Sequence, residues 1–422
     1  MKPGLVVSSE VGALRKVLLH RPGKEVETLT PEMLENLLFE DIPWLKKLRE
    51  EHDGFADLLR KQGCEVYYYS DLLREVLHDT NLAREVAEYL VPTGRLPQSS
   101  LRNEVLEFLL AMSADALVEV MIAGLRKDEI SHGRRNRSLS WWIQEDFPFY
   151  IDPLPNLYFT RDPGMIIGTG MVLGLMQTQA RSREVYLLNL IRCHHELFAP
   201  VRDRLWYGPN NDKDWQNYAT QWHGPGNSLE GGDILVLSDT AVVMGVSMRS
   251  SVNAVETLAE HLFRSDSGIR EILVVKIPVA RACMHLDTVL TMVDWDSFIL
   301  FPGIADSIQV FKLSPGRAGT LKIKEARSLE KGLADVLGVH RVRLIASGIR
   351  DGNIAAREQW NNSANTLAIA PGKIITYNRN NSANELFEKA GIEVLEIDGS
   401  ELTRGRGGPR CMSMPILRDN SP

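Results

Sequence analysis

The feature that most constrains the fold of this chain is a repeated pattern: two strands joined by a short turn, then a helix and a further strand. Four such strand pairs are read from apolar runs that flank turn residues. They are Gly164–Ile167 with Met171–Leu175, Ile234–Leu237 with Ala241–Val246, Val289–Val293 with Phe298–Phe301, and Thr366–Ala370 with Ile374–Tyr377. A doubly wound sheet would show strands and helices alternating without these hairpins.

The hairpins are followed by further elements at regular distances. Helical periodicity is found over Arg183–Leu197, Ser251–Phe263 and Ser382–Ala390, and strands follow two of these helices at Ile272–Ile277 and Glu393–Ile397. The unit that contains Asp294 is less regular. The N-terminal part offers a fifth, degenerate copy with strands Lys16–His20 and Glu65–Tyr69 around helix Asp53–Gln62. Units that repeat every 55–80 residues or so predict radial repetition, a closed ring of ββαβ blades.

One stretch has a different texture and interrupts this pattern. From about Asp71 to Gln144, apolar residues recur at helical spacing with almost no strand pattern, and Pro92 and Pro97 fall between the expected helices. We therefore predict that residues 1–70 form the first unit of the ring, residues 71–148 an inserted all-helical domain, and residues 149–422 the remaining units, which carry the site.

Composition excludes several classes of function. The 422 residues carry a net charge of −7, which argues against a broadly basic nucleic-acid binder, and the small basic patch Gly133–Arg137 is read as a loop between helices. No apolar run approaches the roughly 18 residues of a membrane span, and we expect no signal peptide. Four cysteines without C-x-x-C spacing predict free thiols in a reducing cytoplasm.

Four polar clusters precede strands or stand near the C-terminus. They are Asn156–Gly164, His223–Asp233, Met284–Thr288 and Arg404–Ser413. In a closed ring the strand ends of all units converge on one axis, so we expect these clusters to meet in one site.

Together the clusters offer a nucleophile, a base and several acids. Cys411 lies between Arg406 and Arg410, which are expected to lower the pKa of its thiol, and His285 could carry out acid–base chemistry. Carboxylates at Asp162, Glu230, Asp233 and Asp287 suit a guanidinium group, because each can grip its planar fork. Each residue also has a structural interpretation, as a turn former, a solvated acid, a rim histidine or a small buried side chain.

A metal site is not expected. Cys193, His194, His195 and Glu196 are adjacent on an expected helix, where neighbours point about 100° apart and cannot chelate together. The glycines near Cys411 lack the spacing and the strand–helix frame of a phosphate loop.

The four clusters, in this order and spacing, resemble those of the arginine deiminase family within the guanidino-group-modifying superfamily. The segments Leu18–Gly23 and Phe39–Ile42 add to the resemblance, which covers essentially the whole chain. It implies a five-bladed pseudosymmetric α/β propeller of ββαβ modules with an inserted helical domain. It also implies hydrolysis of L-arginine to L-citrulline and ammonia without a metal or organic cofactor, in a cytoplasmic homo-oligomer.

The resemblance also implies roles for individual residues. Cys411 would be the nucleophile that forms an amidino-cysteine, and His285 would protonate the leaving amine and then activate water. Asp162 and Asp287 would hold the guanidinium nitrogens, with Glu230 on the side of His285. At the other end of the substrate, the carboxylate would be bound by Arg181, Arg249 and Arg406, the amino group by Asn156 and Asp233, and the methylene stem by Phe159.

Several alternatives stay open at the level of sequence. Arg404 and Arg410 compete with Arg406 for the carboxylate, and Pro43 stands where an apolar residue is expected, which could change how the segment Phe39–Trp44 closes. An amidinotransferase would use the same cysteine, histidine and acids with an amine in place of water. A non-catalytic protein that retains the fold is a third possibility.

Overall fold

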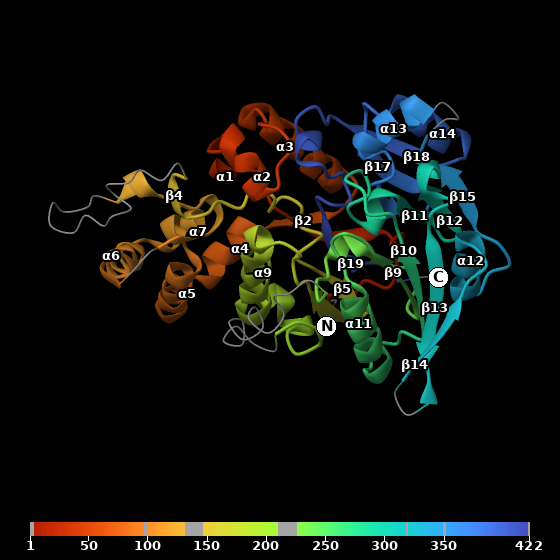
Figure 1. Ribbon diagram of the computed structural model, residues 1–422, viewed down its shortest axis with the longest axis horizontal. Helices are drawn as coiled ribbons and strands as arrows, with labels where there is room; N and C mark the ends of the chain where they lie inside the picture. The colour runs from red at the N-terminus through yellow and green to blue at the C-terminus, as the bar shows by residue number, and fades with distance from the viewer. Residues whose placement is uncertain are drawn as a thin grey trace.

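The computed structural model describes residues 4–96, 99–130, 147–209, 226–317, 320–348 and 352–420. The fold is a mixed α/β architecture in which small sheets and their helices occupy one part of the molecule and a group of helices projects to one side (Figure 1). The expected basic patch at 133–137 lies outside the described residues, as do residues 223–225 of the second cluster.

Five sheets share one arrangement of strands. In each, a central strand pairs antiparallel with one neighbour and parallel with the other, and a helix lies in the connection between the parallel strands. The first sheet and its helix comprise β19 (Met414–Arg418), β1 (Leu14–Leu19), α3 (Leu45–Lys61) and β2 (Glu65–Tyr68). The second comprises β5 (Gly164–Ile167), β6 (Gly170–Leu173), α9 (Ser182–His194) and β7 (Leu205–Tyr207). The third comprises β8 (Ile234–Val236), β9 (Ala241–Val246), α11 (Val252–Arg264) and β10 (Glu271–Lys276). The last two are β11 (Leu290–Asp294), β12 (Ser297–Leu300), α12 (Leu329–Leu337) and β15 (Arg343–Ala346); and β16 (Leu367–Ala370), β17 (Lys373–Tyr377), α14 (Asn381–Lys389) and β18 (Glu393–Ile397).

All four predicted hairpins are therefore confirmed, with ends that differ by one or two residues. The degenerate N-terminal copy is completed by a strand from the other end of the chain, since β1 pairs antiparallel with β19. The unit that contains Asp294 is less regular because a second hairpin, β13 (Gln309–Pro315) and β14 (Leu321–Glu325), leaves it and extends the neighbouring sheet along β10.

The third sheet illustrates why these residues form these elements. Strands β8 and β9 are buried almost throughout, which explains why their sequences are continuous apolar runs rather than alternating ones. Helix α11 begins at an N-cap, where the hydroxyl of Ser251 accepts a hydrogen bond from the amide of Ala254. Its buried residues lie at helical spacing and cover the sheet: Ala254, Val255, Leu258, Ala259 and Leu262.

The segment between β2 and β5 is mainly helical, as predicted, but differs in two details. Its helices are α4 (Tyr69–Val76), α5 (Thr80–Thr93), α6 (Ser99–Leu110) and α7 (Ala114–Ala123), and a short strand pair follows, β3 (Leu125–Arg126) with β4 (Phe149–Ile151). The prediction that Pro92 lies between helices is wrong, because Pro92 belongs to the last turn of α5. A proline near the end of a helix disturbs few hydrogen bonds, so it is tolerated there.

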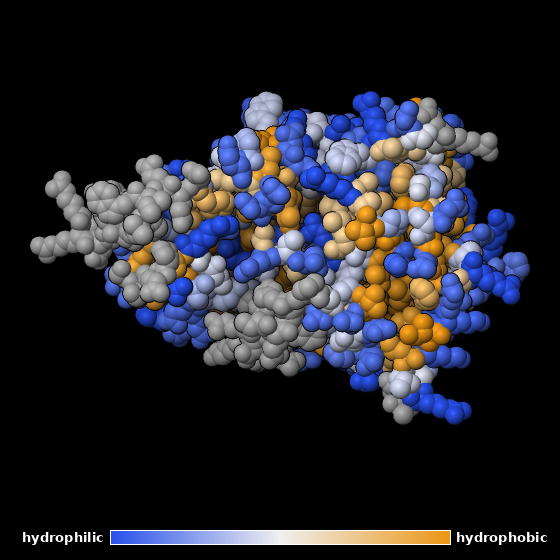
Figure 2. All heavy atoms as spheres, in the orientation of Figure 1, coloured by the Kyte–Doolittle hydropathy of each residue, from blue (hydrophilic) through white to orange (hydrophobic). Residues whose placement is uncertain are grey.

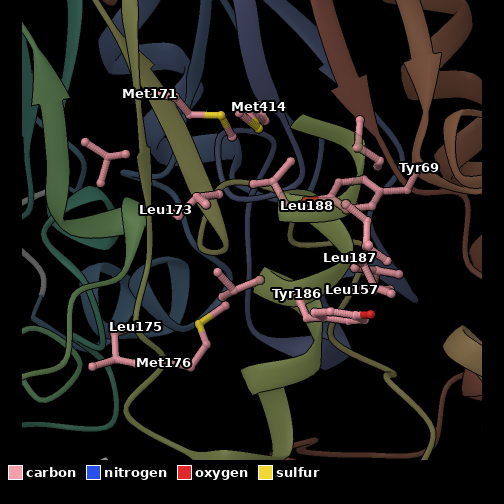
Figure 3. Close-up of a cluster of buried hydrophobic side chains, with 14 of the residues drawn as sticks. Tyr69, Leu157, Met171, Leu173, Leu175, Met176, Tyr186, Leu187, Leu188 and Met414 are labelled. Carbon is pink, nitrogen blue, oxygen red and sulfur yellow. The ribbon is translucent and has the colours of Figure 1, made fainter. Parts of the chain in front are cut away.

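These helices share a hydrophobic core with the sheets. Tyr69 of α4 is buried in the same cluster as Leu188 of α9, Met171 of β6 and Met414 of β19 (Figure 3). The helical segment is thus packed onto the sheets through apolar side chains rather than attached by its two connections alone.

The remaining short elements lie in the connections. They are α1 (Lys24–Glu27), α2 (Leu34–Leu37), α13 (Gly352–Trp360) and the 3-10 turns Pro31–Met33, Lys127–Glu129, Gln179–Arg181, Glu196–Val201, Gly231–Asp233, Leu286–Thr288, Pro302–Ile304 and Leu402–Gly405. Hydrophilic side chains dominate the face shown in Figure 2, with apolar patches between them. No helix within the described ranges combines the length and the apolar character that a membrane span requires.

A buried histidine in α3 makes a testable contribution to stability. His52 is fully buried, neither ring nitrogen has a hydrogen-bond partner within the described part of the chain, and burial lowers its pKa from 6.5 to about 3. The unfolded chain therefore takes up a proton near pH 6.5, whereas the folded chain does so only near pH 3. Stability is complete above the first pKa and falls by about 1.4 kcal/mol per pH unit between the two.

We expect His52→Phe, which keeps a planar ring beside Phe55, to remove this loss. Urea unfolding of both proteins would be measured at several pH values from about 6.5 to 4.5. The free energy of unfolding of the variant, relative to that of the wild type, should increase by about 1.4 kcal/mol for each pH unit of acidification. The exposed His78 provides the control, since His78→Gln also removes one histidine but leaves the buried ring of His52 in place. Equal slopes for His52→Phe and wild type would contradict the prediction.

Candidate active site

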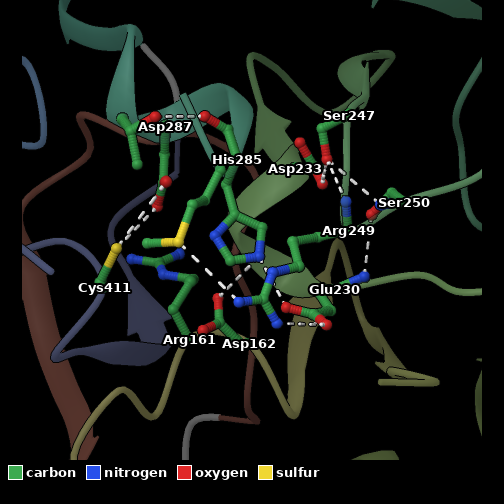
Figure 4. Close-up of polar contacts among 12 residues, drawn as sticks. Arg161, Asp162, Glu230, Asp233, Ser247, Arg249, Ser250, His285, Asp287 and Cys411 are labelled. Atoms are coloured by element: carbon green, nitrogen blue, oxygen red, sulfur yellow. Dashed lines mark hydrogen bonds and ion pairs between the residues drawn. The ribbon is translucent and has the colours of Figure 1, made fainter. Parts of the chain in front are cut away.

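The four polar clusters and Asn365 occupy equivalent positions in the five sheets. Each lies in the loop that enters the first strand of the antiparallel pair, and these loops meet at one cavity. They bring Asp162 before β5, Glu230 and Asp233 before β8, His285 and Asp287 before β11, Asn365 before β16, and Cys411 before β19. Figure 4 shows most of these side chains pointing toward a common centre from separate segments.

The cavity has a volume of about 650 Å³. Eight of the eleven predicted site residues line it: Asn156, Phe159, Asp162, Arg181, Arg249, His285, Arg406 and Cys411. The other three, Glu230, Asp233 and Asp287, are fully buried and lie behind the lining. Segments more than 370 residues apart in sequence therefore contribute to one site, as the convergence of hairpin entries predicts.

Cys411 is held by its backbone on two sides. Its amide donates to the side-chain carbonyl of Asn365 at 3.0 Å, and its carbonyl accepts from the amide of Arg161 at 3.1 Å. Its Sγ lies 3.5 Å from Oδ2 of Asp287. Gly407, four residues before it, has no room for a side chain, because an added Cβ would lie 2.1 Å from the ring of Phe159.

The predicted lowering of the Cys411 pKa is wrong for the ligand-free site. Burial raises the pKa of the thiol well above 9.0, and the charges of Asp287 and Asp162 raise it further. The lowering effect of Arg410 is outweighed, and its guanidinium group pairs with Glu10 and with the same oxygen of Asp287 that lies beside the thiol. The thiol is thus protonated before a cation enters.

His285 lies between two carboxylates. Its Nε2 is 2.7 Å from Oε2 of Glu230 and 3.8 Å from Oδ1 of Asp162. Gly232 makes this close approach possible, since a Cβ there would lie 2.8 Å from the imidazole and 2.9 Å from Asp162. The two glycines between Glu230 and Asp233 are therefore a packing requirement of the site as well as a turn.

The charged forms of His285 and Glu230 stabilise each other. Burial alone would lower the pKa of His285, but Asp162 and Glu230 outweigh it and raise the pKa to about 9. Burial would likewise raise the pKa of Glu230, but Arg249 and His285 lower it to about 2. At neutral pH the imidazole is therefore protonated beside an ionised Glu230, which makes His285 a proton donor in the empty site.

Arg181 is engaged with acids. It donates to Oδ2 of Asp162 at 2.7 Å and to Glu184 at 2.8 Å, and all three side chains are buried. A carboxylate-binding role requires free donors, so these contacts do not favour the role that the resemblance implies. They leave Oδ1 of Asp162 buried without a hydrogen-bond partner among the described residues.

The three C-terminal arginines are separated by the fold. Arg404 is partly exposed and pairs with Asp41 and Glu401 outside the cavity, and Arg410 is buried behind Cys411. Only Arg406 of the three lines the cavity. Its guanidinium stacks over Trp360 at 3.3 Å, and burial lowers its pKa to about 10.

Arg249 presents unused donors. It is buried, and its Nε and Nη1 have no hydrogen-bond partner within the described ranges. Its Nη1 is 3.8 Å from Oε1 of Glu230, and its Nη2 is 3.8 Å from the sulfur of Met284. Unsatisfied buried guanidinium donors are costly, so this position suits an anionic group of a ligand.

The placement of Asp233 does not favour a contact with the substrate amino group. Its carboxylate accepts from the hydroxyl of Ser247 at 2.7 Å and from the amide of Leu286 at 2.8 Å, behind the cavity lining. Burial raises the pKa of Asp233 to about 7. Asn156 does line the cavity, but its side-chain amide donates to the carbonyl of Leu37 at 2.6 Å.

The segment 39–44 contributes its first two residues to the cavity. Phe39 and Glu40 line the cavity, and Glu40 forms a two-bond ion pair with Arg281 at 2.8 and 2.6 Å. The amide of Trp44, directly after Pro43, donates to Glu401 at 2.7 Å. Pro43 is thus accommodated in a segment that is anchored on both sides.

One group in the described ranges has the spacing of a metal site. Ligand atoms of Asp162, Glu230 and His285 lie within 4.8 Å of one another, although Asp162 also pairs with Arg181 and Glu230 with His285. In the segment Cys193–Glu196, His195 follows the end of α9 and its Nε2 lies 2.8 Å from Glu75. That segment adds no ligand to this group.

Sequence reasoning missed four residues that support the site. Glu184 pairs with Arg181, Glu10 grips Arg410 through two contacts of 3.1 Å, Asn365 holds Cys411, and Ser247 holds Asp233. Asn365 could have been found, because it precedes a hairpin as Asp162, Glu230 and His285 do. Nothing local marks Glu10, which is 400 residues from its partner.

Comparison with known proteins agrees with this geometry. A family model described as arginine deiminase matches residues 35–418. The arginine deiminase of Bacillus cereus strain B4264 is 43% identical over 422 residues, which is 99% of both chains, and that of Latilactobacillus sakei is 41% identical over 98% of both. Among solved structures, SxtG, an amidinotransferase from Microseira wollei in the saxitoxin biosynthetic pathway, matches with a TM-score of 0.57 at 12% identity, covering 99% of this chain and 98% of its own.

Proposed function

Because this chain belongs to the arginine deiminase family, we propose that its cavity hydrolyses L-arginine to L-citrulline and ammonia through a covalent intermediate on Cys411. One observation carries the assignment of the chemistry to these residues. Cys411, His285 and Asp162 line the same cavity, with Glu230 and Asp287 buried behind them. A nucleophile, a proton donor and carboxylates for a planar cation are thus assembled in one place.

Substrate binding activates the nucleophile. The guanidinium group takes Oδ1 of Asp162, which has no hydrogen-bond partner among the described residues, and lies against Asp287. Its positive charge offsets the two carboxylates that raise the pKa of the thiol, so the thiol releases its proton to solvent as the cation enters. The sulfur then attacks the guanidinium carbon to give a tetrahedral species.

His285 acts in both halves of the reaction. The protonated imidazole gives its proton to one terminal nitrogen, which leaves as ammonia, and the sulfur remains bonded to a cationic amidino carbon. The neutral imidazole then removes a proton from water, and the hydroxide attacks that carbon. Collapse of the second tetrahedral species breaks the carbon–sulfur bond and forms the carbonyl of citrulline, and the hydroxyl proton passes to the departing sulfur, which restores the thiol.

The non-reacting end of the substrate faces Arg249 and Arg406. Both line the cavity, and Arg249 has buried donors that an α-carboxylate would satisfy. Phe159, also in the lining, supplies an apolar surface for the methylene stem. Arg181 has a different role in this proposal, in which it orients Asp162 through the contact at 2.7 Å.

We also propose that the five sheets close into a pseudosymmetric ring, a five-bladed α/β propeller. Contacts between successive sheets support it, since β19 contacts β5, α11 contacts β7, the turn before β11 contacts β8 and β9, and β11 contacts β16. Contacts between β1 and β16 join the last sheet to the first. Residues 71–148 are then an insertion between the first module and the rest.

The cytoplasmic location and the homo-oligomeric state stay predictions, to be checked by cell fractionation and light scattering.

The decisive test of the activity uses purified protein and arginine alone. We expect citrulline and ammonia in equal amounts, measured by a colorimetric ureido assay and an ammonia electrode. An amidinotransferase would release neither product in these amounts without an added amine acceptor such as glycine. Turnover that requires the amine would overturn the proposal, and so would the absence of turnover under both conditions.

We predict that Arg249→Ala raises KM for arginine by about tenfold to a hundredfold while kcat changes by less than about fivefold, because a charged contact to the non-reacting end is lost. Steady-state kinetics on arginine and on agmatine, which lacks the carboxylate, provide the check. The variant should leave kcat/KM for agmatine near the wild-type value. A kcat loss equal to the loss in kcat/KM would place Arg249 at the reacting end instead.

A further inference from the structure

Asp233 is a buried acid for which the proposed reaction has no direct use. It is inaccessible to solvent, it ends the turn Gly231–Asp233, and it is not part of the cavity lining. Both of its oxygens are nevertheless engaged, Oδ2 by the hydroxyl of Ser247 at 2.7 Å and Oδ1 by the amide of Leu286 at 2.8 Å. A buried carboxylate is expensive to maintain unless such bonds compensate it, so its position calls for an explanation.

The bond to Ser247 leads directly to Arg249. While its hydroxyl donates to Asp233, the oxygen of Ser247 accepts from the amides of Arg249 at 2.9 Å and Ser250 at 3.2 Å. The backbone closes the same turn, since the amide of Ser247 donates to the carbonyl of Ser250 at 3.1 Å. Figure 4 shows this chain of contacts running from Asp233 through Ser247 to the turn that carries Arg249.

The same turn also touches the carboxylate that faces His285. The hydroxyl of Ser250 accepts from the amide of Glu230 at 3.0 Å, and Leu286, held by Asp233, directly follows His285. One buried carboxylate thus ties together the loops before β8 and β11 and the turn after β9. An arginine side chain is long and flexible, and fixing the backbone at its base reduces the conformations it loses on binding.

From these contacts we propose that Asp233 and Ser247 form a positioning pair, which sets the turn 247–250 so that Arg249 presents its donors to the α-carboxylate of the substrate. The inference rests on the proposed function, because it assigns the pair to the recognition that Arg249 performs. It makes Asp233 a positioning residue rather than a contact of the substrate amino group.

Three variants on the full chain test the pair: Ser247→Ala, Arg249→Ala and the double variant. Loss of the hydroxyl is expected to raise KM for arginine by about tenfold with kcat within about twofold, the usual scale of one lost hydrogen bond. On agmatine, kcat/KM should stay at the wild-type value. In the Arg249→Ala background the Ser247→Ala change should add nothing, because the residue through which it acts is gone.

Two further variants separate positioning from general loss of structure. Ser247→Thr keeps the hydroxyl and should restore a wild-type KM. Ser251→Ala removes a neighbouring, half-buried hydroxyl that caps α11, so it should lower the melting temperature without changing KM. Asp233→Asn loses an acceptor for Ser247 and should raise KM as Ser247→Ala does. Should Ser247→Ala not fold, Ser247→Cys, whose thiol is a poor donor, takes its place.

The outcomes distinguish the two levels of the argument. An unchanged KM for arginine in folded Ser247→Ala, or an effect that adds fully to that of Arg249→Ala, overturns the positioning pair. If Arg249→Ala itself leaves KM for arginine unchanged, carboxylate binding by Arg249 fails, and the positioning role falls with it. A raised KM for arginine in both single variants, with no further increase in the double variant, supports carboxylate binding by Arg249 and the positioning pair.

Discussion

Replacing Cys411 with alanine is expected to lower kcat for arginine by at least about 10⁴-fold, because removal of a covalent nucleophile leaves only binding and electrostatic stabilisation. The lining residues and the buried acids stay in place, so arginine should still bind. Citrulline formation over hours at high enzyme concentration measures the residual rate, and calorimetry measures the binding. Mass spectrometry of acid-quenched wild type should show an amidino adduct on the peptide that holds Cys411.

Cys64 provides the matched control. It is also a buried cysteine, and burial raises the pKa of its thiol to about 12, but it does not line the cavity. Cys64→Ala should therefore keep kcat within about twofold, since a substitution in the core away from the active site affects stability rather than the chemical step. Turnover by Cys411→Ala above about 1% of wild type, or an adduct on Cys64, would refute the covalent mechanism on Cys411.

Replacing His285 with asparagine is expected to lower kcat by about 10³-fold, within the range of lost general acid–base catalysis. Asparagine keeps a polar group near Glu230 but cannot transfer a proton. Rapid-quench mass spectrometry should then show less adduct than in the wild type, because the first leaving group also needs the proton of His285. Wild-type amounts of adduct with slow citrulline release would restrict His285 to the hydrolysis of the intermediate.

The pH dependence of kcat/KM tests the protonation state of His285. The pKa of His285 is raised to about 9 by Asp162 and Glu230 against the effect of burial, so kcat/KM should fall as the pH rises through about 9 and the imidazole loses its proton. Glu230→Gln removes one of the two charges that favour the protonated ring. The alkaline limb should then move to lower pH, by one unit or more as an order of magnitude. A limb that stays in place would mean that another group sets it.

Much of the architecture is local in origin. Apolar runs flanking turn residues predicted four hairpins, and α9, α11 and α14 follow three of them within a few residues of the expected bounds. The left-handed backbone of Gly168 and Gly372, with φ of 58° and 68°, shows why glycine occupies two of those turns. Because Asp162, Glu230 and His285 precede such hairpins, the pattern of the units also predicted where part of the chemistry would be.

The assignment of charge could not be predicted in this way. The sequence places Arg406 and Arg410 beside Cys411, which favoured a thiolate, whereas the fold turns Arg410 toward Glu10 and stacks Arg406 on Trp360. Burial then decides the protonation state of the thiol. Adjacency in sequence says little about which side chains share a low-dielectric environment.

For the polar residues around the cavity, the identities of the groups follow from the sequence, whereas their pairings follow from the fold. The sequence by itself determined the repeated units, the helical segment between two of them, and the group of one thiol, one imidazole and several acids. Only the tertiary structure decided that Arg181 pairs with acids, that Asp233 binds Ser247, and that Arg249 keeps unused donors. The physical reason is that secondary structure follows from the spacing of neighbouring residues, whereas burial and pairing of charges depend on groups that the fold brings together from as far as 404 residues away.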